Sequence, residues 1–359
     1  MHISMSDVKI TINENLLVER MAELFGFDRL AEILPGDIPL PYLYLSTFLI
    51  FDHGIAQMYI HFATDGTHIL LQSPSAIVSV PGLYLGAFGI RYISDGYSDA
   101  VESFPLSSQE DDFTVFNSLV SFRAKLVMYI IIILVYYPYV LVGIGWQNIF
   151  ASQGVFGLVN TLLVWQIGYF PFVIEFGLLY FGIHFLLPRR IAGADVSMFF
   201  YDTRNMGGFA VVGNLLKYSY YIFTVGLLLY FIFVYGPFFS IGTAIGTGPG
   251  LLEALIFSIV WLLGIASIAY SMFTMHRFMA GKKNKRIAEL EAEVEDIIEN
   301  PYDINNSEVT NKEQLEDIYR RRQEIRDTRV YPATFTMWSQ IAISVILPQA
   351  LNVAVQTAG

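Results

Sequence analysis

The sequence predicts an all-α fold, a polytopic membrane bundle of helices with a helical hairpin in the cytoplasm. Three observations predict this class. Of the 359 residues, 54% are hydrophobic and only 15% are charged, which is too apolar for a soluble domain of this size. Several apolar runs reach the roughly 20 residues that a membrane-spanning helix needs. The basic residues gather in the segments that would lie on one side of the membrane.

The N-terminal segment, residues 1–37, is expected to be cytoplasmic and to form an amphipathic helix over residues 13–34. Its apolar residues recur mostly every three to four positions behind Asn13 or Asn15, either of which would cap the helix. Such a helix could be an ordinary packed element or a lipid anchor on the inner face of the membrane. The pattern fits both equally well.

Residues 38–275 are expected to hold six membrane spans. The first is interrupted by Asp52 and His53, and the second by Pro81 and several glycines. Together with the last segment of the chain they would make seven spans, at about residues 39–62, 76–94, 126–149, 155–187, 209–236, 251–275 and 333–357.

The positive-inside rule predicts that the N-terminus lies inside and the C-terminus outside. In this orientation all 21 Lys and Arg residues fall in cytoplasmic segments or at their flanks. A chain that lacked the first two spans would keep the same residues on the same sides. The charges therefore do not choose between five and seven spans.

Residues 276–330 predict a cytoplasmic anchor hairpin of two helices. The sixth span would continue into the first helix and stop before Pro301, and Thr310 with Glu313 would form a capping box for the second. The hairpin would pack either within one subunit or between subunits. The predicted seams are Ile287, Leu290, Val294 and Ile297 on the first helix and Leu315, Ile318, Arg322 and Ile325 on the second.

One carboxylate, Glu175, lies inside a long predicted span, within about three turns of Trp165 and Tyr169. A charge within a span is costly and is a functional candidate by default. Glu175, Trp165 and Tyr169 are therefore candidates for a ligand pocket. The alternative is that Glu175 pairs with Arg91 or with another base at the inner end of the bundle.

Two further polar groups have simpler interpretations. The sequence DTRNMGGF, residues 202–209, predicts a tight turn before the fifth span rather than a site. His61, His68 and Asp65 in the first outer loop are interpreted as solvated surface, so no metal site is expected.

The final segment, residues 331–359, is apolar and uncharged but rich in polar side chains, and Pro348 interrupts it. Amides and hydroxyls in lipid are costly unless they have partners. We therefore expect this helix to face water or copies of itself. The candidate pore-lining residues are Ser339, Gln340, Ser344, Gln349, Asn352 and Gln356.

The composition also excludes several functions. The chain has no cysteine, which excludes disulfides, thiolate nucleophiles and iron–sulfur clusters. The net charge of −11 argues against nucleic acid as a partner. No hydrolase, zinc-protease or dinucleotide-binding motif is present, so neither catalytic residues nor a cofactor are expected.

This architecture resembles the superfamily of insect odorant and gustatory receptors and their relatives outside animals. In the last span Thr334, Phe335, Gln340 and Ile341 echo the motif of the gustatory receptors, with one residue fewer between the pairs and Ser339 in the apolar stretch. The resemblance implies a homotetramer, a central cation pore lined by the last helix, a cytoplasmic anchor domain and a ligand pocket among spans two to six.

The sequence thus predicts a weakly selective channel for monovalent or divalent cations in the cell membrane, surrounded by lipid and either gated by a small molecule or constitutively open. A second hypothesis is a membrane sensor or scaffold that binds a cytoplasmic partner through residues 276–329. A transporter that uses Glu175 is a third hypothesis, but no convincing inverted repeat supports it.

Overall fold

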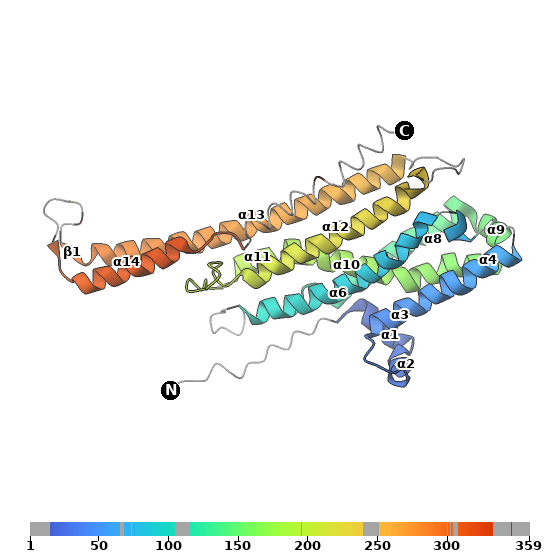
Figure 1. Ribbon diagram of the computed structural model, residues 1–359, viewed down its shortest axis with the longest axis horizontal. Coiled ribbons are helices and arrows are strands. Elements are labelled where there is room, and N and C mark those ends of the chain that lie inside the picture. Colours follow the sequence, from blue (N-terminus) through green and yellow to red (C-terminus); the bar gives the residue numbers. More distant parts are fainter. Residues whose placement is uncertain are drawn as a thin grey trace.

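A computed structural model describes residues 15–64, 68–72, 74–104, 115–194, 196–239, 251–299, 301, 303, 308–332 and 346. The chain is mostly helical (81%), which confirms the all-α class. Within the described part, a single pair of short antiparallel strands, β1 (Ile298–Glu299) and β2 (Glu308–Val309), closes the tip of the hairpin. Figure 1 shows the long helices lying side by side and the hairpin extending beyond one end.

The N-terminal segment folds as two short helices, α1 (Leu17–Leu24) and α2 (Phe27–Ile33), so the prediction of one helix over residues 13–34 was wrong. Gly26 separates them with a φ of 77°, a left-handed conformation that glycine adopts without steric cost. Asn15 does not cap α1, because Leu16 occupies the capping position and no side chain caps the helix. Asn13 lies outside the described residues.

The first membrane-length rod joins α3 (Leu40–Leu49), the π-helix η1 (Ile50–Ala56) and α4 (Gln57–Ala63) without leaving helical geometry. Two short turns follow, α5 (Ile69–Gln72) and the 3₁₀-helix η2 (Pro74–Val78). They lead into α6 (Ser79–Glu102), which packs against α12 (Ala210–Phe239) and α10 (Phe170–Phe181).

The next helical stretch doubles back on itself. Its elements are α8 (Phe122–Pro138), η3 (Tyr139–Gly145), α9 (Trp146–Val159), η4 (Asn160–Tyr169), α10 (Phe170–Phe181), η5 (Gly182–Leu186) and α11 (Leu187–Gly193), of which η3, η4 and η5 are π-helical. Gly145 and Gly154 have positive φ values where the chain turns. Contacts between α8 and α10 hold the two arms together.

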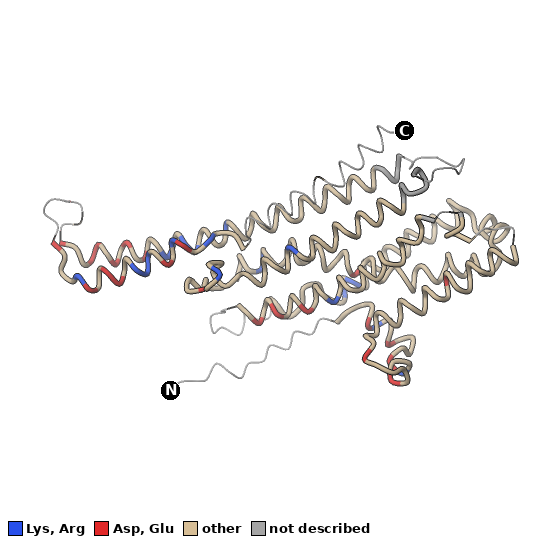
Figure 2. Tube along the Cα trace, in the orientation of Figure 1, with Lys and Arg blue, Asp and Glu red and all other residues tan. Residues whose placement is uncertain are grey.

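The last described helices are α12 (Ala210–Phe239), α13 (Leu251–Glu295) and α14 (Lys312–Asp327). The 45 residues of α13 make a rod of about 68 Å at 1.5 Å per residue, roughly twice the thickness of a bilayer core. This confirms that the predicted span continues into the hairpin. Figure 2 shows acidic and basic residues gathered along the hairpin half of α13 and along α14.

The hairpin packs on itself within one chain. Leu290 and Ile297 of the first arm form a buried cluster with Ile318 and Ile325 of α14, as predicted. Arg322, also placed in the predicted seam, is exposed and forms an ion pair with Glu291 of the first arm. The predicted capping box was wrong by one residue. Asn311, not Thr310, occupies the capping position, and its Oδ1 accepts a hydrogen bond from the Gln314 N–H at 3.2 Å.

Four helical stretches among the described residues are long and apolar enough to cross a membrane: Ser75–Glu102, Phe122–Gly193, Ala210–Phe233 and Leu255–Glu295. They support a membrane protein built as a helical bundle. The predicted last span, residues 333–357, lies outside the described residues except for Ile346.

Candidate functional site

A buried carboxylate joins two π-helical segments. Asp52 lies in η1, and its two oxygens accept hydrogen bonds from Asn160 Nδ2 at 2.7 Å and from the Tyr169 hydroxyl at 2.8 Å, both in η4. Asn160 and Tyr169 are nine residues apart, which is two and a half turns of an α-helix and would place them on opposite sides. The wider π turn, closed by i→i+5 hydrogen bonds, brings both to the same side.

The charge of Asp52 has no basic partner among the residues that the structure describes. Its exposure is only 5%, and the ion pairs of the described bundle do not include it. The two donors are neutral, so they satisfy hydrogen bonds without balancing the charge. A buried carboxylate in this state is costly, which makes it a candidate for a functional group.

Asp52 lies at the wall of a partly open cavity of about 590 Å³ at the end of the bundle opposite the hairpin, where α4 and α9 lie in Figure 1. The cavity runs between η1, α6, η4, α10, α12 and α13. Its size is within the roughly 300–1,000 Å³ of small-molecule sites. The aromatic residues in its wall are Trp165, Tyr169, Phe170, Phe172, Phe176, Phe223, Tyr230 and Phe233.

Two of the three ligand-pocket candidates, Trp165 and Tyr169, line this cavity. His53, also in the wall, has a buried Nδ1 without a hydrogen-bond partner among the described residues. His68 Nε2 contacts the His53 carbonyl at 3.3 Å and its Nδ1 accepts from the Leu70 N–H at 3.1 Å. The ring of His68 thus ties the loop after α4 to η1. Asp65 of the predicted trio lies outside the described residues.

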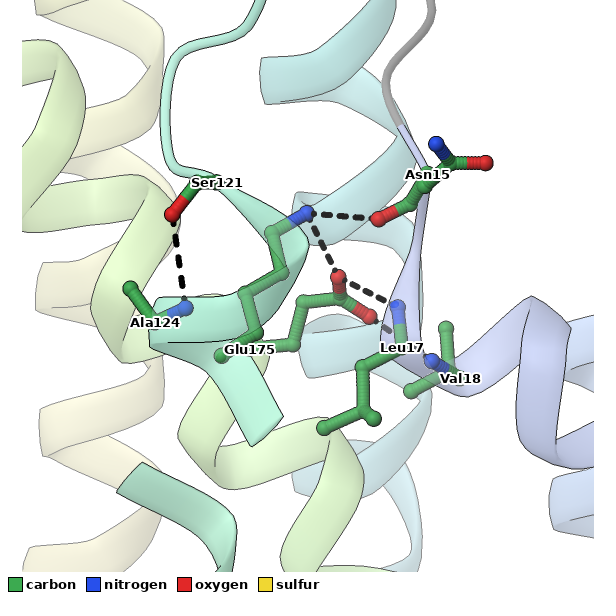
Figure 3. Close-up of polar contacts among 7 residues, drawn as sticks. Asn15, Leu17, Val18, Ser121, Ala124 and Glu175 are labelled. Carbon is green, nitrogen blue, oxygen red and sulfur yellow. Dashed lines mark hydrogen bonds and ion pairs between the residues drawn. The ribbon is translucent and has the colours of Figure 1, made fainter. Parts of the chain in front are cut away.

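The third candidate, Glu175, lies elsewhere. It is fully buried where the N-terminal segment meets α8 and α10, and it accepts hydrogen bonds from the backbone N–H groups of Leu17 at 2.7 Å and Val18 at 2.9 Å. Lys125 Nζ is 2.9 Å from Glu175 Oε1 and donates to the Asn15 carbonyl at 3.1 Å. Figure 3 shows these contacts converging at the start of α1.

The structure therefore favours the alternative interpretation of Glu175, in which this carboxylate forms an ion pair with a base. Its partner is Lys125 and not Arg91. Because α1 has no capping side chain of its own, the Glu175 carboxylate binds the first free N–H groups of this helix and complements its positive N-terminal dipole. Glu175 is not among the residues of the cavity wall.

The candidate pore-lining residues, Ser339, Gln340, Ser344, Gln349, Asn352 and Gln356, all lie outside the described residues. The chain that leads into them, residues 328–332, is described and is called the junction below. Lys283 Nζ donates to the carbonyls of Arg326 and Thr328, both at 2.7 Å. His276 Nδ1 contacts the Val330 carbonyl at 3.1 Å, and the His276 ring stacks on Tyr331.

The turn predicted from DTRNMGGF is present and holds the other side of the junction. The Asp202 carboxylate accepts from the N–H groups of Arg204, Met206 and Gly208 at 3.0–3.1 Å, and α12 begins two residues later. Burial alone would raise the pKa of Asp202, but the three donors outweigh it and lower this pKa below 3.8. The Asn205 carbonyl accepts from the Arg329 N–H at 2.8 Å.

No protein-family model, no curated protein and no solved structure matches this chain.

Sequence reasoning missed Asp52 and Asn160 as members of one network. The signal for Asp52 was present, because a lone carboxylate inside an apolar run is a functional candidate under the same rule that selected Glu175. Its pairing with Asn160 and Tyr169 depends on the π-helical turns of η1 and η4, which no residue pattern in the sequence indicates.

Proposed function

We propose that this chain is a ligand-gated, weakly selective cation channel of the cell membrane, similar in plan to the odorant and gustatory receptor superfamily that its sequence resembles. The observation that supports this best is that two helices, α12 and α13, contribute both to the cavity and to the contacts of the junction. A ligand bound in the cavity would therefore shift the position of the last segment, residues 333–357.

The coupling runs along both helices. At one end Phe223 of α12 and Val260 of α13 line the cavity. At the other end His276 and Lys283 of α13 bind the carbonyls of the junction. On α12, a Cβ added to Gly213 would collide with the Pro332 carbonyl, so this helix lies directly against the chain that enters the last segment. A change in the packing of α12 on α13 would move the junction.

In this proposal the chain forms a homotetramer with seven spans per subunit, the N-terminus inside and the C-terminus outside. The last helix of each subunit surrounds the pore, and its neutral amides and hydroxyls offer dipoles to monovalent or divalent cations without a fixed charge. Such a lining discriminates poorly among cations.

A sensor or scaffold protein is the second candidate, and the hairpin favours it. The outward surface of α14 is charged and exposed, with Tyr319 48% exposed beside Arg320. A cytoplasmic partner would bind this surface. Deleting residues 287–325 would then abolish partner binding while leaving the oligomer and any conductance intact.

Purified full-length protein in planar bilayers tests the channel. We expect cation currents with little discrimination between Na⁺ and K⁺, and we expect Gln340→Ala and Gln349→Ala to change the unit conductance. Gln323→Ala, on the exposed surface of the hairpin, is the matched control and should leave it unchanged. A silent protein, or equal conductance in all four proteins, would contradict the proposal.

A further inference from the structure

The described wall of the cavity includes a carboxylate but no strongly basic side chain. Asp52 is the one carboxylate among its lining residues, and neither a lysine nor an arginine lines it in the part of the chain that the structure describes. The other lining groups that can ionise are His53, Tyr169 and Tyr230. An apolar ligand with no charge would leave the Asp52 carboxylate unbalanced in a site from which it had displaced water.

The Asp52 carboxylate also has room for another donor. A carboxylate accepts about four hydrogen bonds, and Asn160 and Tyr169 supply one to each oxygen. The positive charge of a ligand group would also balance the charge of this carboxylate. A group that carries several N–H donors and a positive charge satisfies both needs of Asp52.

The rest of the wall suits the body of such a ligand. Trp165, Tyr169 and Tyr230 present rings to the cavity, and the electron-rich faces of aromatic rings attract cations. The remaining lining is mostly aliphatic side chains and phenylalanines, including Phe172 and Phe176. A cation with an apolar skeleton fits this composition better than a sugar or an anion, which would need polar or basic walls.

We propose that the cavity binds a protonated amine with an aromatic or aliphatic body, and that its ammonium group pairs with Asp52. This inference rests on the proposed function of the cavity as the ligand site. It goes further in naming the chemical class of the ligand and the residue that selects it.

The test measures binding to full-length protein in lipid nanodiscs by calorimetry. The probes are 2-phenylethylamine, tryptamine and cyclohexylmethylamine. Each is compared with the corresponding alcohol, in which a hydroxyl replaces the amino group. We expect the amines to bind at least tenfold more tightly than their alcohols. If no amine binds, or if the alcohols bind as tightly, the inference is overturned.

Asp52→Asn keeps the size of the side chain and an acceptor for its neighbours but removes the charge. It should weaken amine binding at least tenfold and leave alcohol binding unchanged, whereas Asp95→Asn, which lines a different groove, should change neither. The comparison of amines with alcohols on the unmodified protein stands even if Asp52→Asn does not fold.

The two proposals fail in different ways. If amine binding depends on Asp52 but the protein never conducts, the proposed ligand class is supported and the proposed channel function is contradicted. If the protein conducts but does not prefer amines, the channel function is supported and the ligand class is contradicted.

Discussion

Glu175 and Lys125 bury opposite charges at the point where the N-terminal segment meets the bundle. Both side chains are fully buried, and the carboxylate also caps α1. A buried pair of this kind adds little net stability over an apolar pair, but removing one partner leaves a charge without compensation. The pair therefore fixes where α1 docks more than it strengthens the fold.

Replacing Lys125 with methionine tests this role. The Glu175 charge would remain buried with only the two backbone donors, so we expect a loss of about 3–5 kcal/mol in the free energy of unfolding. Arg123→Met removes an exposed charge two residues away and should have little effect. Thermal unfolding in detergent measures both. An unchanged Lys125→Met protein would contradict the ion pair, and a partial recovery in Lys125→Met/Glu175→Gln would support it.

Gly213 is the second residue at which a small change has a large expected effect. Its position on α12 leaves no space for a Cβ beside the Pro332 carbonyl, so Gly213→Ala should displace the junction. We expect faster hydrogen exchange at residues 328–331 and, in the channel, an altered open probability. Gly281→Ala on α13 is the control, because a Cβ there meets no atom within 4 Å. Equal exchange in the two variants would show that the junction does not depend on this contact.

At the scale of elements, regular helical periods were predictable and departures from them were not. The seams of the hairpin follow a period of three to four residues, and Leu290, Ile297, Ile318 and Ile325 meet as predicted. The π-helical turns break that period, so Asp52, Asn160 and Tyr169 could not be assembled from spacing. The ion-pair partner of Glu175 could not be identified from the sequence either. Lys125 is 50 residues away, and Arg91 was an equally suitable basic partner.

The start of α14 gives a direct comparison between a predicted and an observed cap. Asn311→Ala removes the side-chain acceptor for the Gln314 N–H and should destabilise α14 by about 1 kcal/mol. Thr310→Ala removes the predicted cap, which does not cap α14 in the structure, and should be nearly neutral. Hydrogen exchange of residues 312–317 in the full-length protein reports both changes. A larger effect from Thr310→Ala would restore the predicted capping box.

The turn at Asp202 should depend on pH. The pKa of Asp202 is lowered in the folded chain, so its contribution to stability is present above 3.8 and is lost as the pH falls through the lowered value. We expect the amides of residues 204–208 to lose protection, corrected for intrinsic exchange, as the pH falls below 3.8. Asp202→Asn, which cannot ionise, should show a smaller change over this range. Equal pH dependence in both proteins would exclude Asp202 as the cause.

At the scale of the whole molecule, α12 and α13 connect the cavity with the junction, and the sequence did not indicate this connection. The cavity and the junction lie toward opposite ends of α12 and α13, and both helices contribute to each. The sequence predicted the long rod of α13, the hairpin and two residues of the cavity wall. It could not predict that the turn at residues 202–208 holds the junction, because the Arg329 N–H and the Asn205 carbonyl meet only through tertiary packing.

The central claim is that four copies of this chain surround a pore with their last helices innermost. Electron microscopy of the purified full-length protein in nanodiscs tests it most directly, because it reports both the number of subunits and the symmetry axis. The account predicts fourfold symmetry, with residues 333–357 closest to the axis and Gln340 and Gln349 facing it. A monomer, or an oligomer in which residues 333–357 face lipid, would contradict it.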